Sequence, residues 1–231
     1  MGKNLIYITG MPKGGTTLTK SLFNCFHDVY VVLADRDAPY RVPHDITARN
    51  VVVKGLRLGR DIPFFKNSGF RSMVVLRDIR DQIASSWEDD SVHGKRYSTT
   101  RQGKEMQINL EHFLSVVVPN YDYLEIRYED ICRKPEESQQ KIAEYFDLSP
   151  RCPFAEGYKY FGGYSNPRDK ALYDNDYVAL KGGFDRPALR PVDTESIGRW
   201  QNHPCKEFAL EFLEDVSAAQ LYLDTYYPEK V

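Results

Sequence analysis

The stretch LIYITGMPKGGTTL (residues 5–18) decides the fold, because it joins a predicted buried strand to a predicted helix through a glycine-rich loop. Residues 5–9 are apolar or β-branched without alternation, which is typical of a parallel strand covered on both faces. The loop over residues 10–17 then brings backbone amides and a helix N-terminus together, and this arrangement binds phosphate. The stretch therefore predicts an anion site at the end of the first strand, and the alternative is a glycine-rich turn without a ligand.

The loop differs from that of the nucleoside triphosphatases at one position. It follows the frame Gly-x4-Gly-Lys-Ser/Thr, but Thr16 stands where the lysine belongs, and the lysine lies earlier, at Lys13. A nucleoside triphosphatase needs that lysine beside the β- and γ-phosphates and a hydroxyl on Mg²⁺. The displacement argues against an ordinary ATPase or kinase and leaves the anion cradle intact.

The rest of the chain alternates predicted strands with predicted helices. Further apolar runs predict strands at residues 29–33, 51–53, 73–76 and 123–127. Apolar residues at helical spacing predict helices over residues 17–26, over residues 105–118, from Pro135 onward and over residues 206–223. This alternation indicates an α/β fold with a mainly parallel five-stranded sheet flanked by helices.

Length and composition limit the number of domains and argue against several classes of function. The 231 residues predict one domain over residues 1–231, with an irregular segment rich in aromatic residues and glycine at about 152–192. A net charge of -2 argues against a nucleic-acid partner, and no apolar run approaches the roughly 18 residues of a membrane span. Four widely spaced cysteines without a CxxC pair predict free thiols and no metal site. With a strand already predicted at residue 5 and no signal peptide before it, we expect a cytoplasmic protein.

Other strand ends also carry polar residues. Arg77 follows the strand over residues 73–76, at the edge where α/β sheets bind ligands. Ser85 lies eight residues later, about two helical turns, so the pair suits a second phosphate. The alternative is a surface ion pair between Arg77 and Asp81. Residues 128–130 read Tyr-Glu-Asp before the helix at Pro135, and residues 198–200 read Gly-Arg-Trp.

These four elements together resemble the sulfotransferases that use 3′-phosphoadenylyl sulfate (PAPS), and they run in family order from residue 10 to residue 200. Residues 12–17 resemble the family's 5′-phosphosulfate loop, and Arg77 with Ser85 resembles its 3′-phosphate motif. The resemblance implies a P-loop NTPase-like sulfotransferase architecture. It also implies an enzyme that moves a sulfuryl group from PAPS to a hydroxyl or amine by in-line displacement and releases adenosine 3′,5′-bisphosphate (PAP).

The resemblance also implies roles for individual residues. Lys13 contacts the phosphosulfate and stabilises the leaving phosphate oxygen, where positive charge matters most and no metal is required. Lys54 matches a second family lysine at a strand end, and its alternative is a solvated strand terminus. Tyr128 lies near the adenine. The implied cofactor-binding residues are Lys13, Gly14, Gly15, Thr16, Thr17, Arg77, Ser85, Tyr128 and Arg190, the last from a basic stretch over residues 181–199 without a clear register.

The acceptor needs a general base. Phenol-type and steroid-type family members place a histidine where this chain has Leu56. Carbohydrate-type members use a carboxylate about 22 residues beyond the loop lysine, and the resemblance places Asp35 there, with Asp37 as the substitute. His44 and His93 remain alternatives, and both aspartates could be ordinary loop residues.

Two other functions stay open. One is a P-loop kinase of a small metabolite, and the other is a nucleotide-binding module without catalysis. For the sulfotransferase, we expect a small-molecule or carbohydrate acceptor and neither a nucleic-acid nor a membrane partner. The sequence leaves the acceptor's identity and the oligomeric state open.

Overall fold

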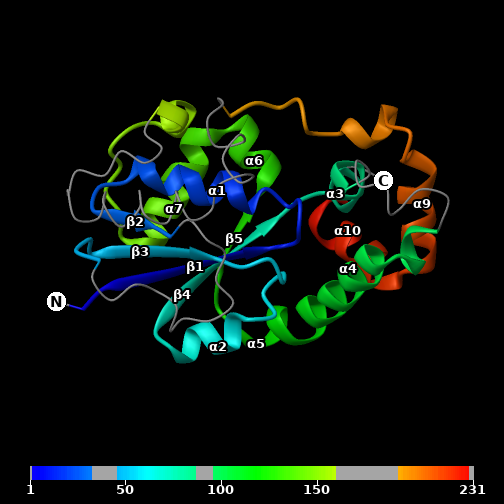
Figure 1. Cartoon of the computed structure of the whole chain (residues 1–231), viewed down its shortest axis with the longest axis horizontal. Coiled ribbons are helices and arrows are strands. Elements are labelled where there is room, and N and C mark those ends of the chain that lie inside the picture. Colours follow the sequence, from blue (N-terminus) through cyan, green and yellow to red (C-terminus); the bar gives the residue numbers. More distant parts are fainter. Residues whose placement is uncertain (1, 33–45, 87–95, 160–191, 229–231) are drawn as a thin grey trace.

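The computed structural model describes residues 2–32, 46–86, 96–159 and 192–228, and these residues form a five-stranded parallel sheet with helices on both faces (Figure 1). All of its strand pairs are parallel. The predicted α/β class is therefore confirmed. The strands are β1 (Asn4–Gly10), β2 (Val29–Val31), β3 (Asn50–Lys54), β4 (Phe70–Leu76) and β5 (Leu124–Arg127), in the order β2-β3-β1-β4-β5.

β1 lies at the centre of the sheet, and this position creates the crevice in which α/β proteins bind ligands. From β1 the chain first builds β2 and β3 on one side and then β4 and β5 on the other. The strand order thus changes direction between β1 and β4, and the carboxyl ends of these two strands border the crevice. The glycine-rich loop follows β1 and Arg77 follows β4, so the fold brings both sequence elements to this place.

Helices cover the two faces of the sheet and bury separate cores. α1, α6 and α7 cover one face, where Ile6, Ile8 and Met73 are fully buried. α2, α3, α4, α9 and α10 pack with the other face, where Tyr7, Val53 and Val74 are fully buried. The helices are α1 (Thr16–Leu22), α2 (Ile62–Asn67), α3 (Ile79–Ser86), α4 (Arg101–His112), α5 (Val118–Asn120), α6 (Tyr128–Arg133), α7 (Pro135–Phe146), α9 (Lys206–Asp215) and α10 (Ser217–Tyr226).

The sequence predicts one C-terminal helix over residues 206–223, and this prediction is wrong because the structure has two helices, α9 and α10, in its place. Val216 adopts an extended conformation and separates α9 from α10, while its own side chain remains buried. The apolar spacing continues across the break, which explains why the sequence pattern suggested one helix. The break allows α10 to pack against α4 and α9 and to bring Tyr222 to the end of β4.

Two other predicted helices differ from the structure at their ends. α1 ends at Leu22, and the turn Phe23–Cys25 is a 3-10 helix, so the helix predicted over residues 17–26 is too long. α4 starts at Arg101, earlier than predicted, because the Thr100 side chain accepts a hydrogen bond from the Gly103 amide and caps the helix. Residues Phe113–Val117 continue as a π-helical turn.

None of the helices in the described part of the chain has the length and apolar composition that crossing a membrane requires. All four cysteines are buried free thiols, as predicted. The aromatic segment at about 152–192 lies mostly outside the described residues, and the described part includes the 3-10 helix Phe154–Lys159. One domain over residues 1–231 stays a prediction.

Candidate functional site

The loop after β1 turns sharply around Lys13 and Gly15. Lys13 has a φ of 61° and Gly15 a φ of 88°, and Gly14 donates its amide to the Met11 carbonyl at 2.9 Å. A left-handed conformation is unusual for a lysine and is found where surrounding structure imposes it. This turn leaves the Lys13 side chain exposed and places α1 directly after Gly15.

Gly15 is also a point of close approach between the loop and α6. A Cβ atom at this position would collide with the ring of Tyr128, the first residue of α6. Glycine is required here both for its positive φ and for the space that Tyr128 occupies. The predicted contact of Tyr128 with an adenine stays a prediction, but the structure does place this ring against the glycine-rich loop over residues 10–17.

Lys54 is buried, so the alternative of a solvated strand end is wrong. Its side chain is 1% exposed, and its Nζ donates to Thr17 Oγ1 at 2.9 Å. The neighbouring strand β3 therefore supplies an ammonium group at the start of α1, where the chain lacks the usual loop lysine. Thr16 is buried, and its methyl group lies 2.6 Å from the position of a Cβ at Gly10.

Arg77 joins the loop to the C-terminal part of the chain. Its Nη1 donates to the Lys13 carbonyl at 2.6 Å, and its Nη2 donates to the Ser196 carbonyl at 3.0 Å. Arg77 is 5% exposed, so the alternative of a surface ion pair with Asp81 is wrong. Among the described residues, its Nε has no hydrogen-bond partner although it is buried. A buried unpaired guanidinium N–H requires an explanation, and an anion would supply one.

Ser85 lies near the end of α3 and is partly buried. It lines a cavity of about 310 Å³ together with Lys13, so the structure brings these two predicted residues together. Arg77 reaches the backbone of the same Lys13. The joint contact of Arg77 and Ser85 with one phosphate stays a prediction.

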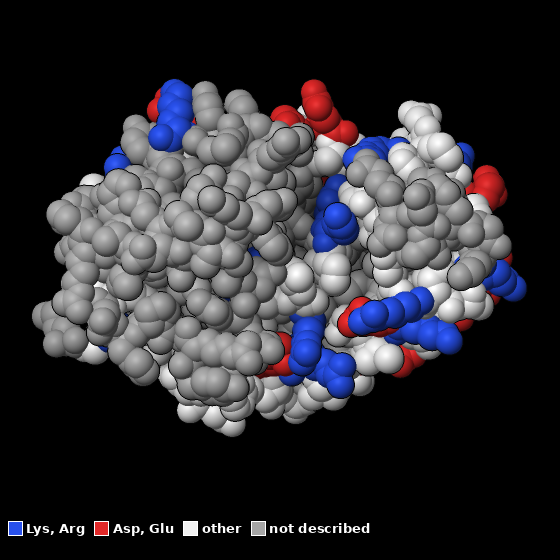
Figure 2. Space-filling model, viewed as in Figure 1, with Lys and Arg blue, Asp and Glu red and all other residues white. Residues whose placement is uncertain are grey.

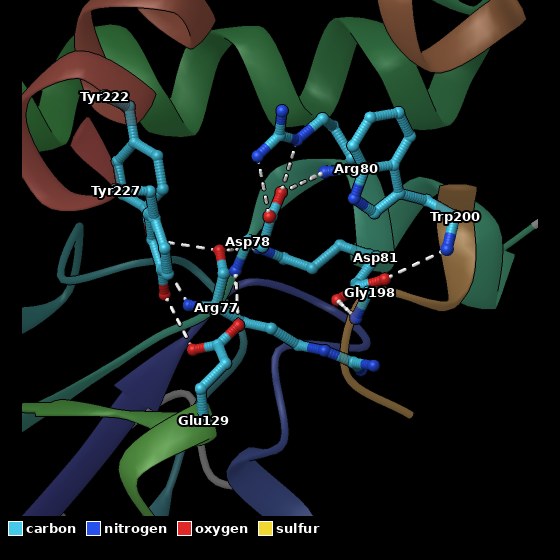
Figure 3. A network of polar contacts seen from close by, with 10 residues as sticks. Arg77, Asp78, Arg80, Asp81, Glu129, Gly198, Trp200, Tyr222 and Tyr227 are labelled. Carbon is cyan, nitrogen blue, oxygen red and sulfur yellow. Dashed lines mark hydrogen bonds and ion pairs between the residues drawn. The ribbon is translucent and has the colours of Figure 1, made fainter. Parts of the chain in front are cut away.

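Asp81 holds the C-terminal Gly-Arg-Trp element in place, as Figure 3 shows. Its carboxylate accepts hydrogen bonds from the Gly198 amide at 2.7 Å and from the Trp200 amide at 3.1 Å. Burial raises the pKa of Asp81, and these two amide donors oppose the effect. The Arg80 guanidinium lies 4.4 Å from the centre of the Trp200 ring and forms an ion pair with Asp78.

Three further residues connect the Tyr-Glu-Asp element to the end of β4 (Figure 3). Glu129 accepts a hydrogen bond from the Asp78 amide at 3.0 Å and another from the Tyr227 hydroxyl at 3.0 Å. The Tyr222 hydroxyl donates to the Arg77 carbonyl at 3.2 Å. The sequence analysis missed Glu129, Tyr222 and Tyr227 as site residues, and only the Tyr-Glu-Asp element gave a signal for the first.

Tyr128 is fixed on two sides. Its hydroxyl lies 2.8 Å from the Ser196 hydroxyl, and the Arg77 guanidinium carbon lies 4.6 Å from its ring centre. Burial raises the pKa of Tyr128, so its phenol stays neutral at physiological pH. The loop, β4, α6 and residues 196–200 therefore meet around the two side chains of Arg77 and Tyr128.

Several predicted residues lie outside the described residues: Asp35, Asp37, His44, His93 and Arg190. Their roles stay predictions. Among the residues that Figure 2 draws in colour, several Lys and Arg side chains lie near the middle of the face shown.

The chain is similar to known proteins in its three-dimensional structure but not in its sequence. No protein-family model matches this chain, and no curated protein sequence does. The sulfotransferase domain from the curacin biosynthetic pathway superposes with a TM-score of 0.54 at 11% identity, over 93% of this chain and 98% of that one.

Two further structures match at TM-scores of 0.49. Mouse sulfotransferase SULT7A1 complexed with PAP has 16% identity, over 96% of this chain and 89% of that chain. Retinol dehydratase in complex with androsterone and PAP has 15% identity, over 93% of this chain and 81% of that chain. On the strength of the curacin match, the chain has the α/β fold of a sulfotransferase domain.

Proposed function

We propose that this protein transfers a sulfuryl group from PAPS to a hydroxyl or amine of a small-molecule or carbohydrate acceptor. One observation carries the proposal: Lys13, Lys54 and Arg77 follow or end three adjacent parallel strands and converge on one glycine-rich loop. Three positive side chains at one sheet edge suit a ligand with several negative charges.

The residues present fit such a nucleotide. The buried Nε of Arg77 lacks a partner within the described residues, and the loop has the tight turn at Gly15 that lets an anion approach the backbone. Lys13 and Lys54 would hold the 5′-phosphosulfate, Arg77 and Ser85 the 3′-phosphate, and Tyr128 the adenine. When bound, PAPS supplies an activated sulfuryl group whose leaving group is a phosphate.

The chain's own residues account for the rest of the chemistry. Lys13 and Lys54 place positive charge where a phosphate oxygen becomes more negative during transfer, and such charge lowers the barrier more than it strengthens ground-state binding. A carboxylate at Asp35 would accept the proton of the acceptor. Because the loop lacks the Lys-Ser/Thr pair that accompanies Mg²⁺ in triphosphatases, we expect transfer to proceed without a divalent ion.

The experiment is PAP release from PAPS in the presence of a mixed acceptor panel and excess EDTA. We expect acceptor-dependent PAP formation that Lys13→Ala lowers strongly, with Lys66→Ala, on the distant helix α2, as the control. A strict requirement for Mg²⁺, or transfer of phosphate from ATP to the same acceptors, would replace this function with that of a kinase.

A further inference from the structure

Cys25 and Cys152 lie side by side in the structure, although the sequence separates them widely. Cys25 ends the 3-10 helix Phe23–Cys25, and Cys152 lies in the bend that follows α7. Arg151 and Cys152 both donate their backbone amides to the Cys25 carbonyl, at 2.6 and 3.3 Å. A disulfide needs Cα atoms less than about 7 Å apart, and two residues joined by a backbone hydrogen bond meet this condition.

The side chains of the two residues meet as well. The Cys25 thiol contacts the Cys152 thiol, and its Sγ donates to the Pro153 carbonyl at 3.7 Å. On another side, a Cβ at Gly157 would lie 2.9 Å from Cys25 Sγ and 2.8 Å from a methyl carbon of Leu22. The 3-10 helix that contains Gly157 therefore packs tightly against the end of α1 and encloses the thiol pair.

The other two cysteines differ from this pair in their contacts and not in their burial. All four cysteines are buried free thiols. Cys132 lies in α6, where its thiol contacts Tyr128, and Cys205 immediately precedes α9. Burial raises the pKa of both Cys132 and Cys205 to about 11. Burial and the contact with Cys152 also raise the pKa of Cys25, so its thiol stays protonated at physiological pH.

We propose that Cys25 and Cys152 are an oxidation site, at which a small-molecule disulfide such as oxidised glutathione converts the two thiols into one disulfide bond. Neither cysteine is among the residues proposed to bind the nucleotide. The backbone contact and the thiol contact together place the two sulfur atoms for this bond.

The reaction is a pair of thiol–disulfide exchanges. Cys152 is 7% exposed and Cys25 is 0% exposed, so Cys152 meets the oxidant first. Its thiolate attacks one sulfur of oxidised glutathione and expels a glutathione thiolate. Cys25 then attacks the Cys152 sulfur and expels the second glutathione thiolate. Each expelled thiolate takes up one of the two protein thiol protons, so two protein thiols are oxidised and one oxidised glutathione is reduced to two thiols.

The bond would join the end of α1 to the bend before the 3-10 helix Phe154–Lys159. Pro153, which follows Cys152, is 128 positions from Cys25 in the sequence. The disulfide therefore closes a long loop and removes many conformations from the unfolded chain. We expect the oxidised protein to melt at least about 5 °C above the reduced protein.

The experiment refolds the full chain from urea in a glutathione redox buffer. Unfolding exposes every thiol, so burial does not limit the reaction, and the folding chain selects which sulfur atoms meet. Remaining thiols are alkylated, and peptides are mapped by mass spectrometry without reductant. We expect one major linkage, Cys25 to Cys152, and a melting temperature that falls by the same interval after reduction with dithiothreitol.

Matched variants connect the shift to this pair. Cys25→Ala, and Cys152→Ala as a second variant, should each lose the linkage and the difference in melting temperature between oxidised and reduced protein. Cys205→Ala is the control, because Cys205 is equally buried and should leave both unchanged. Each variant is compared with its own reduced form, so a loss of packing caused by the substitution itself cancels.

Three results would overturn the inference. One is the absence of the Cys25–Cys152 linkage, including its replacement by glutathione mixed disulfides. Another is an equal yield of linkages through Cys132 or Cys205. The third is a linked protein that melts no higher than its reduced form, which would show that the native structure does not accommodate the bond and that the two thiols only pack as small apolar groups.

Discussion

The guanidinium carbon of Arg77 lies 4.6 Å from the centre of the Tyr128 ring, and the same ring blocks any side chain at Gly15. Arg77 also donates to the Lys13 carbonyl. These contacts connect the ends of β1, β4 and β5, although the three segments are far apart in the sequence. The phosphate loop is therefore held in shape by the residues that we propose bind the rest of the nucleotide.

Arg77→Ala should weaken PAP binding by roughly 2–4 kcal/mol, because it removes one partner of a desolvated charge pair. Arg77→Lys should recover only part of this loss, since an ammonium cannot replace the planar guanidinium that donates to two carbonyls. The measurement is isothermal titration calorimetry with PAP. Arg57→Ala serves as the control because its side chain is exposed; a loss in this variant equal to that of Arg77→Ala would show a general charge effect.

Gly15→Ala should unfold far more easily than Gly69→Ala. Both glycines have positive φ, so an alanine costs about 1–2 kcal/mol at either position. Only at Gly15 does the added Cβ also collide with Tyr128, whereas nothing lies within 4 Å at Gly69. We expect a further loss of about 1–3 kcal/mol from this overpacking, measured by urea unfolding. Equal losses in the two variants would mean that Tyr128 does not pack against the loop.

Asp35→Asn should lower kcat by about 10²-fold or more and leave PAP affinity nearly unchanged, as expected for removal of a general base. The swap is almost isosteric, so altered packing cannot account for a large loss. Asp37→Asn is the matched variant two residues away. If only Asp37→Asn loses activity, the base is Asp37, and if neither variant does, a histidine or another group takes the proton.

We expect the titration of Tyr97 to lower the free energy of unfolding at alkaline pH. Burial raises the pKa of Tyr97 from 10.0 to about 12. The folded state then retains a proton that the unfolded state releases, so this contribution is complete below pH 10 and is lost as pH rises toward 12. Over this interval one such proton changes the free energy of unfolding by about 1.4 kcal/mol per pH unit. Urea unfolding at pH 9, 10 and 11 should show a shallower decline for Tyr97→Phe than for the wild type, and parallel declines would contradict this contribution of Tyr97.

The strands and the phosphate loop could be predicted because their signals are local. An unbroken apolar run indicates a strand buried on both faces, and a glycine-rich loop between a strand and a helix can be recognised from a few residues. For the same reason the positions of Lys13 and Arg77, just beyond two strand ends, could be predicted. The structure places both of them at the edge where the sequence predicted them.

The long-range contacts could not be predicted in this way. Asp81 accepts from Gly198 and Trp200, which are 117 and 119 residues away, and no periodicity encodes that pairing. The break at Val216 was missed because apolar residues continue at helical spacing on both sides of it. Tyr222 and Tyr227 reach the site only because of this break, so their hydroxyls also escaped the sequence analysis.

The most direct test of the account compares PAP with adenosine 5′-monophosphate, which differs from it only in lacking the 3′-phosphate. Calorimetry on the wild type should show PAP binding at least roughly tenfold more tightly, because a guanidinium–phosphate contact is charge-assisted. In Arg77→Ala the two affinities should become similar. Equal affinities for PAP, adenosine 5′-monophosphate and ATP in the wild type would contradict a 3′-phosphate site at Arg77, and with it the assignment of PAPS as the donor.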